Sequence, residues 1–176
     1  MSPTGKKQSG TGRVEMREFL RPDDETALLE LLRDTGFFSP EEVLVAGELI
    51  LEALSKGPDS GYHFLVLEID GVPAGFACHG PVPASRCSYD LYWIAVHPRH
   101  QGRGLGAKLL GRVEELIAAQ GGERVYIETS SQSQYRPTQG FYISRGYQLE
   151  ATLKDFYARG DNKQIYSKEL SKAPQD

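Results

Sequence analysis

The fold of this chain is decided by residues 89–106, which read YDLYWIAVHPRHQGRGLG. The first eight positions, Tyr89 to Val96, are rich in aromatic and β-branched side chains and predict a buried strand. His97-Pro98 ends that strand, because proline fixes its φ angle and has no N–H to donate. A glycine-rich turn over Gln101 to Gly106 then leads into a helix. Apolar residues at helical spacing give this helix a buried face, namely Leu105, Leu109, Val113, Leu116 and Ile117.

The glycine-rich turn predicts a site for an anion. Its glycines leave backbone N–H groups accessible at the positive end of the helix dipole, which favours a phosphate. Two common phosphate-binding patterns do not fit. A P-loop requires Gly-Lys-Ser/Thr, whereas the chain has Gly106-Ala107-Lys108. A dinucleotide-binding fold places its glycines after the first strand, whereas these lie past the middle of the chain.

The segments on either side of this unit predict further strands. Upstream, Tyr62–Ile69 and Val72–Cys78 are expected to pair through a hairpin turn at Asp70-Gly71, followed by a proline-rich loop over 81–88. Downstream, Gly121-Gly122 ends the helix. The expected elements that follow are a strand over Arg124–Thr129, a short helix over Gln134–Arg145, and strands over Tyr147–Leu153 and Lys163–Leu170, joined by Lys154–Asn162. A strand, a helix and a strand in succession favour a parallel βαβ unit.

The N-terminal part predicts one strand and two helices. The strand covers Arg13–Leu20, and the first helix begins at Pro22–Glu25 and ends at Gly36. In the second helix, Ser39 is the expected N-cap, with Pro40 in the first turn and Glu42 completing a capping box. The whole pattern predicts one α/β (α+β) domain over 13–170, a mixed sheet of about seven strands with about four helices. We expect residues 1–12 to be a disordered tail and 171–176 a frayed end.

Composition limits the classes of function. The net charge is −4 and the pI is near 5.6, which argues against a nucleic-acid partner. No apolar run approaches the ~20 residues that cross a bilayer, so no membrane partner is expected. Two cysteines do not indicate a disulfide framework, and a cytoplasmic location is expected. The spacing of Cys78, His79, Cys87, His97 and His100 does not indicate a metal site.

Two motifs together resemble the Gcn5-related N-acetyltransferase (GNAT) superfamily. The first is Gln101-Gly102-Arg103-Gly104-Leu105-Gly106, which matches the Gln/Arg-x-x-Gly-x-Gly/Ala pattern and follows the lead-in Ile94-Ala95-Val96-His97-Pro98. The second is Phe141-Tyr142-Ile143-Ser144-Arg145-Gly146-Tyr147, an aromatic-Tyr pair that ends in glycine and an aromatic residue. The order of strands and helices agrees from about Arg13 to Leu170. The resemblance implies the acyl-CoA N-acyltransferase fold, mostly antiparallel and splayed between the fourth and fifth strands.

The resemblance also implies acetyl-CoA as cosubstrate and no metal. In this family the turn wraps the pyrophosphate of coenzyme A, a role that falls here on Gln101, Gly102, Arg103, Gly104, Leu105 and Gly106. The pantetheine arm runs between the splayed strands, held by backbone groups of Ile94, Ala95 and Val96, where one N–H would polarise the thioester carbonyl. Many members carry Asn where Tyr135 stands and Ala where Thr138 stands. Whether Tyr135 contacts the pantetheine in place of that Asn is left open.

The implied reaction is direct attack of an amine on acetyl-CoA. Tyr142 matches the family's usual proton donor, and transfer from a tyrosine to a thiolate is uphill by only about 2 kcal/mol. The base is Asp90, Glu128 or a water relay. By a period of two, Asp90 is expected to share one strand face with Tyr92, Ile94 and Val96. Glu128 lies on the neighbouring predicted strand.

The sequence does not name the acceptor amine. Phe37-Phe38 and Asp155–Asp161 are expected on the acceptor side, where aromatic rings and carboxylates fit a cation. The sequence favours a small-molecule amine. A protein or peptide N-acetyltransferase and a non-catalytic acyl-CoA-binding sensor are the alternatives. Family members often form homodimers through the sheet edge or late strands, which this sequence does not specify.

Overall fold

The structure, a computed structural model, describes residues 12–171. Strands and helices follow one another in the expected order. They are β1 (Val14–Arg17), α1 (Asp24–Thr35), α2 (Pro40–Lys56), β2 (His63–Ile69), β3 (Val72–Pro81), β4 (Ser88–Val96), α3 (Leu105–Ala119), β5 (Arg124–Ser130), α4 (Arg136–Ser144), β6 (Gln148–Ala158) and β7 (Asp161–Glu169). Short 3-10 turns cover Gly57–Ser60, Pro98–His100 and Ser133–Tyr135. The tail and the frayed end expected from the sequence lie almost wholly outside the described residues.

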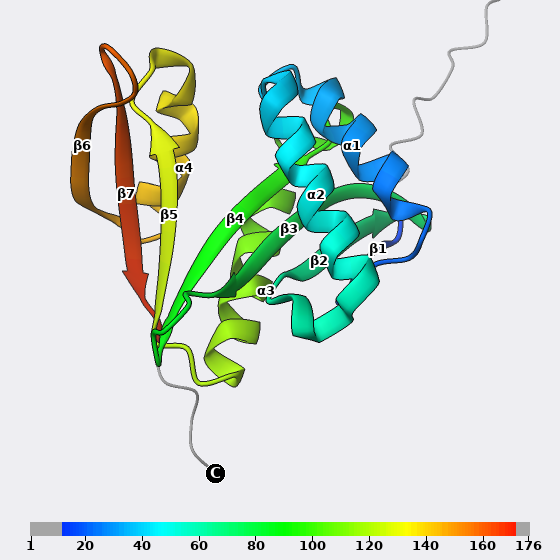
Figure 1. Cartoon of the computed structure of the whole chain (residues 1–176). Helices are drawn as coiled ribbons and strands as arrows, with labels where there is room; N and C mark the ends of the chain where they lie inside the picture. The colour runs from blue at the N-terminus through cyan, green and yellow to red at the C-terminus, as the bar shows by residue number, and fades with distance from the viewer. Residues whose placement is uncertain (1–11, 172–176) are drawn as a thin grey trace, which may run out of the picture.

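The strands form one seven-stranded sheet in the order β1-β2-β3-β4-β5-β7-β6. β4 and β5 are parallel, with α3 as the crossover between them, and the other neighbours are antiparallel. This arrangement confirms the mixed sheet and the βαβ unit that the sequence predicts. Helices cover both faces of β1–β4, α1 and α2 on one face and α3 on the other (Figure 1).

Each face of this half of the sheet has its own hydrophobic core. On the α1/α2 face, Leu28, Leu32 and Ile50 pack against Phe64 and Phe76. The core on the α3 face is built from Leu65, Leu67 and Ala77 of the strands and Leu109, Val113 and Ile117 of the helix. All of these side chains are buried. β4 therefore packs against helices on both faces of the sheet, and these contacts hold the strand in place.

The start of α2 is set by local signals. Ser39 is the N-cap, and its hydroxyl accepts a hydrogen bond from Glu42 N at 3.2 Å. In return, Glu42 Oε2 accepts one from Ser39 N at 2.7 Å. This reciprocal pair satisfies two helix-end donors and confirms the predicted capping box.

β4 and β5 separate after only three residue pairs. Ser88, Tyr89 and Asp90 pair with Arg124, Val125 and Tyr126, and the pairing then stops. Beyond that point β5 pairs only with β7. The two strands diverge from a common base, so that β5, β7, β6 and α4 form a separate arm (Figure 1). The predicted splay between the fourth and fifth strands is confirmed.

A β-bulge in β4 changes which side chains share a face. Leu91 pairs with His79 and Trp93 pairs with Cys78, so Tyr92 is an extra residue in the strand. Trp93 therefore packs on the α1/α2 face, and Ile94 returns to the α3 face. The expectation that Asp90 and Tyr92 share a face with Ile94 and Val96 is wrong, because a period of two does not survive an inserted residue.

The hairpin of β6 and β7 is longer than the sequence predicts. Residues 154–158, expected in a connection, belong to β6, and the strands turn at Arg159-Gly160. Two contacts tighten this end, because Asp155 N donates to Asn162 Oδ1 at 2.9 Å and Gly160 N donates to Asp155 Oδ1 at 2.6 Å. Asp155 has a φ of 53°, which kinks the strand next to Phe156 and Tyr157.

Candidate active site

The glycine-rich turn presents the start of α3 to solvent. Gly102 and Gly104 have φ angles of 73° and 74°, a left-handed conformation that glycine adopts without strain. Gly104 is the N-cap of α3 and supplies no side chain to its free N–H groups. Gln101 folds back and donates from Nε2 to the Val96 carbonyl at 2.9 Å. The turn therefore joins the end of β4 to an uncapped helix N-terminus, which favours an anion.

Basic side chains lie near this turn, with Asp34 as an acidic neighbour 3.1 Å from His97. Arg99 and Arg103 are both exposed, and Arg103 Nη1 lies 3.1 Å from His100 Nδ1. Burial, together with the charges of Arg103, His97 and Arg99, lowers the pKa of His100. These charges add to the helix dipole, so this end of the molecule is suited to a polyanionic group.

The edge of β4 that faces β5 is open along its second half. Among the described residues, no strand pairs with Leu91–Val96 on that side. Apart from the Val96 carbonyl, which accepts from Gln101, the backbone groups that point to this side are available to a ligand, because the other edge of β4 is paired with β3. Ile94, Ala95 and Val96 therefore lie where an extended ligand could bind the strand by its backbone.

The divergence of the strands forms a cavity of about 1310 Å³. Its walls come from the α1–α2 connection and the start of α2, the open half of β4, the end of β5, the start of α4, and the β6–β7 hairpin. The predicted site residues that line it are Asp90, Ile94, Ala95, Val96, Gln101, Glu128, Tyr135 and Tyr142. The structure therefore brings these residues to one space. Gly102, Arg103, Gly104, Leu105 and Gly106 are not part of the lining and lie beyond its end, in the turn and the first residues of α3.

Tyr142 is buried in the wall of this cavity. Its side chain comes from α4, is 5% exposed, and lies between the rings of Phe141 and Tyr147 at centroid distances of 5.4 and 5.7 Å. Within residues 12–171, no group forms a hydrogen bond with its hydroxyl. Burial raises the pKa of Tyr142, so the phenol keeps its proton in the resting protein.

Tyr147 supports Tyr142 from behind. Its hydroxyl donates to Glu114 Oε1 at 3.0 Å, and Lys168 Nζ lies 2.7 Å from Glu114 Oε2. Tyr147 N also donates to the Tyr142 carbonyl at 3.1 Å. These contacts fix the end of α4 against α3 and β7, and they hold the ring of Tyr142 in place.

Asp90 and Glu128 face the cavity from the two diverging strands. Burial, together with the charge of Glu128, raises the pKa of Asp90, and Lys163 acts in the opposite direction. Glu128 Oε2 forms an ion pair with Lys163 Nζ at 2.5 Å. Lys163 Nζ also lies 4.3 Å from the centre of the Phe156 ring. Among the described residues, Asp90 has no such ion pair, which leaves its carboxylate available to a ligand.

Aromatic side chains line the cavity where the α1–α2 connection approaches the opposite arm. Phe37 contacts Tyr135 edge to face at 4.8 Å, which joins the α1–α2 connection to the opposite arm. Phe38 contacts Trp93 at 5.1 Å. Tyr157 and Asp161 also line the space, as the sequence predicts for this segment. Tyr135 is thus committed to a ring contact, and a contact with pantetheine stays a prediction.

Several lining or supporting residues were missed by reasoning from the sequence. Glu41 and Glu42 were assigned only to a helix start, and Lys163 only to a strand. Gln132, Gln134, Thr129 and Ser130 also line the cavity. The sequence contains one indication that Glu41 lines the cavity: the capping segment of α2, which includes Glu41, directly follows Phe37-Phe38. Lys163 gave none, since its pairing with Glu128 depends on the register of β5 with β7.

Two further properties concern the described residues as a whole. None of the helices within residues 12–171 combines the length and the apolar character that crossing a bilayer requires. In the same part of the chain, no cluster of three or more His, Cys, Asp or Glu side chains is arranged to hold a metal ion.

Comparison with known proteins shows which family this chain resembles. Residues 21–147 match the family model described as Acetyltransferase (GNAT) family. The solved structure of a GNAT-family protein from Desulfovibrio desulfuricans is 44% identical, with a TM-score of 0.89, and the match covers 90% of this chain and 100% of that one.

Two curated relatives are longer proteins. A mycothiol acetyltransferase from Thermobispora bispora is 33% identical over 139 residues, which are 79% of this chain and 43% of that protein. An amino-acid acetyltransferase from Ectopseudomonas mendocina is 27% identical over 107 residues, 61% of this chain and 24% of that protein. The chain thus matches less than half the length of either relative.

Proposed function

The chain belongs to the acetyltransferase (GNAT) family, and from that membership we propose that it is an acetyl-CoA-dependent N-acetyltransferase acting on a primary amine. One observation carries the proposal. Tyr142 is a buried phenol without a hydrogen-bond partner among the described residues, and it lies in the wall of the cavity between β4 and β5. A protonated phenol in such a place is suited to give a proton to a departing thiolate.

The residues present fit acetyl-CoA, which would supply the acetyl group as a reactive thioester. A Cβ placed on Gly102 or Gly104 would meet no atom within 4 Å, so a pyrophosphate has room to approach the backbone there. Gln101, Gly102, Arg103, Gly104, Leu105 and Gly106 are proposed to hold it. The open edge at Ile94, Ala95 and Val96 is proposed to bind the pantetheine arm by backbone hydrogen bonds.

The proton transfers can be assigned to side chains that line the cavity. An ammonium acceptor gives one proton to a carboxylate, and the neutral nitrogen attacks the thioester carbonyl carbon. The new C–N bond replaces the C–S bond. Tyr142 Oη donates its proton to the sulfur that departs, and an N–H on the edge of β4 polarises the carbonyl oxygen. The second proton that the nitrogen loses as it becomes an amide passes to the tyrosinate and restores the phenol.

Asp90 is proposed as the acceptor of the ammonium proton. Its raised pKa makes it a stronger base than an exposed aspartate, and it has no ion-pair partner among the described residues. Glu128 is already paired with Lys163. Glu128, or a water that relays the proton to either carboxylate, is the alternative. The pH–rate profiles described below distinguish the two carboxylates.

Acetyl transfer to a panel of amines tests this function. The protein is incubated with acetyl-CoA and polyamines, amino acids, aminoglycosides or peptides, while coenzyme A thiol and acetylated product are measured together. We expect equimolar thiol and acetylated amine with at least one acceptor. Tight coenzyme A binding without acetylation of any amine would contradict the proposal and favour a non-catalytic acyl-CoA sensor.

A further inference from the structure

The cavity has an unbalanced charge. Five carboxylates line it, from Glu41, Glu42, Asp90, Glu128 and Asp161, whereas no Lys, Arg or His of the described chain is in the lining. Lys163 compensates one of them from just outside. Carboxylates gathered around one space repel one another, and a cationic occupant would relieve that repulsion.

Most of these carboxylates already have protein partners. Glu42 caps α2 through Ser39 N, and Glu128 pairs with Lys163. Asp161 accepts hydrogen bonds from Ser130 Oγ at 2.5 Å and from Gln132 Nε2 at 2.8 Å. Among the described residues, Asp90 and Glu41 have neither an ion pair nor a hydrogen bond from a side chain. Two carboxylates are therefore available to a ligand.

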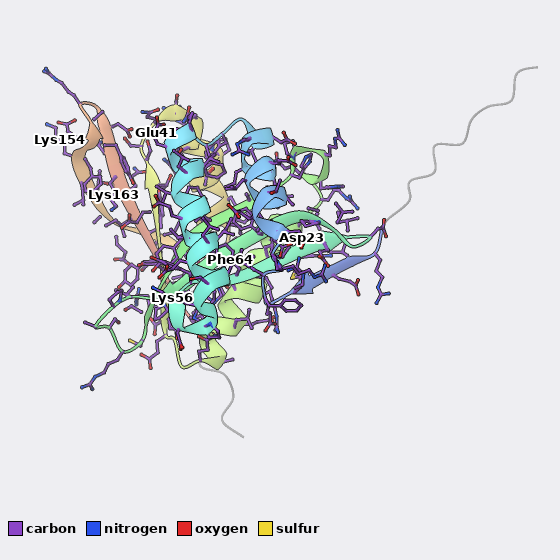
Figure 2. The ribbon with its side chains drawn as sticks, turned by 45° about the vertical axis from the view of Figure 1, so that its right-hand side comes forward. Asp23, Glu41, Lys56, Phe64, Lys154 and Lys163 are labelled. Atoms are coloured by element: carbon purple, nitrogen blue, oxygen red, sulfur yellow. The ribbon has the colours of Figure 1, made fainter. Side chains whose placement is uncertain are left out.

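The two available carboxylates lie in different parts of the cavity. Asp90 is on β4, at the point where β4 and β5 separate. Glu41 is in the first turn of α2 and is labelled in Figure 2. Aromatic rings line the space that both carboxylates share, including Phe37, Tyr135 and Tyr157. Cations bind favourably over such rings, particularly where carboxylates are near.

A second observation indicates where the reacting end of a ligand would lie. Tyr142 is 5% exposed, has no hydrogen-bond partner among the described residues, and lines the same cavity. Its position, with Asp90, marks where the thioester and the attacking nitrogen would meet. Glu41 lies on a different element and is not needed for that chemistry.

Resting on the proposed function, we propose that the acceptor is a dication. One amine is acetylated beside Asp90, while Glu41 and the neighbouring aromatic rings hold a second positive group. The negative potential of the cavity's carboxylates disfavours an acceptor that carries a carboxylate at its far end. Cationic residues lie instead at the glycine-rich turn, just beyond the end of the cavity, so these two neighbouring regions differ in charge.

Three amines with five carbons each test the inference. Cadaverine has a second amine at its far end, pentylamine has a methyl group there, and δ-aminovalerate has a carboxylate. We expect kcat/KM to be about tenfold higher for cadaverine than for pentylamine, and lowest for δ-aminovalerate. The preference for cadaverine should shrink as salt is added, since salt screens partly exposed charges.

A matched pair of variants tests the role of Glu41. Glu41→Gln should lower the ratio of kcat/KM for cadaverine over pentylamine by about threefold to fivefold, as expected for one partly exposed charge. Glu48→Gln removes the same charge from the exposed surface of α2, outside the cavity lining, and should leave the ratio unchanged. An unchanged ratio in Glu41→Gln would overturn the assignment of Glu41.

The acetylation results separate this inference from the proposed function. Acetylation of pentylamine as fast as cadaverine, together with equal acetylation of the lysine and norleucine peptides described next, would overturn the dication while leaving acetyl transfer intact. No acetylation of any amine would contradict both. A second positive charge can also reach the cavity on a peptide, so tripeptides with lysine or norleucine at the second position form another arm. A preference for lysine there, with no preference among the free amines, would identify a peptide as the source of the dication.

Discussion

Asp90 and Glu128 are chemically alike, but their surroundings in the structure differ. Asp90 is half-buried and has no ion-pair partner among the described residues, and its pKa is raised. Glu128 is held by Lys163, which in turn packs on Phe156. The sequence shows two carboxylates on neighbouring strands but cannot rank them. Their ranking depends on Lys163, which lies opposite Ser130 in the register of β5 with β7 and reaches Glu128 diagonally.

We predict that Asp90 controls the acid limb of the pH–rate profile. Because its pKa is raised, kcat/KM should rise with pH above the range of an ordinary aspartate. Asp90→Asn should lower kcat/KM about 10²-fold near neutral pH, and higher pH should restore part of it as free amine forms. Glu128→Gln is the matched control and should keep the limb but move it to lower pH, because the charge of Glu128 helps to raise the pKa of Asp90. Loss of the limb in Glu128→Gln alone would assign the base to Glu128.

Features of the helices and strands that depend on residues close together in sequence could be predicted. Features that depend on how one strand aligns with another could not. The capping box at Ser39 and the turn into α3 are encoded within a few residues, and both are confirmed. The bulge at Tyr92 depends on how β4 aligns with β3. The extension of β6 through Ala158 depends on contacts between Asp155 and Asn162 across the hairpin. The secondary-structure propensities of nearby residues do not indicate either alignment.

Two glycines of α3 provide a prediction about the anion site. Gly104 has a φ of 74°, so Gly104→Ala should lower the free energy of unfolding by about 1 kcal/mol and raise the KM for acetyl-CoA. Gly111 lies inside the helix with open space around it, so Gly111→Ala should raise stability by about 0.5–1 kcal/mol. Urea unfolding and steady-state kinetics measure both effects. A Gly104→Ala protein with wild-type KM would argue against cofactor binding at the turn.

At the scale of the whole molecule, the sheet is two rigid parts that share a short base. β1 to β4 have a helical layer on each face, whereas β5, β7 and β6 form an arm beside them (Figure 1). The site exists because these parts diverge, and motif residues alone do not reveal it. A homodimer stays a prediction. The outer strand β6 carries exposed apolar side chains at Leu149, Leu153 and Phe156.

His79 predicts how the stability of the molecule depends on pH. It is 1% exposed, and neither ring nitrogen has a hydrogen-bond partner among the described residues. Burial, with a smaller effect of His63, lowers the pKa of His79 from 6.5 to about 4. The unfolded chain therefore binds more protons between these values, so stability falls as pH drops from 6.5 toward 4, by roughly 3 kcal/mol at most.

The variant His79→Leu isolates this contribution. It removes the titrating group and two unpartnered nitrogens while keeping an apolar side chain in the core. Urea unfolding of both proteins across this pH range should show a smaller acid loss in the variant. Parallel stability curves for the two proteins would show that His79 does not control the dependence.

We propose that Tyr142 protonates the departing thiolate in the cavity formed by the splayed strands. This proposal is tested most directly by the rate of coenzyme A release from acetyl-CoA by Tyr142→Phe, with amine saturating. We predict that kcat falls by about 10²-fold or more while the KM for acetyl-CoA changes little, because the variant loses only the proton. Wild-type kcat in Tyr142→Phe would contradict the account.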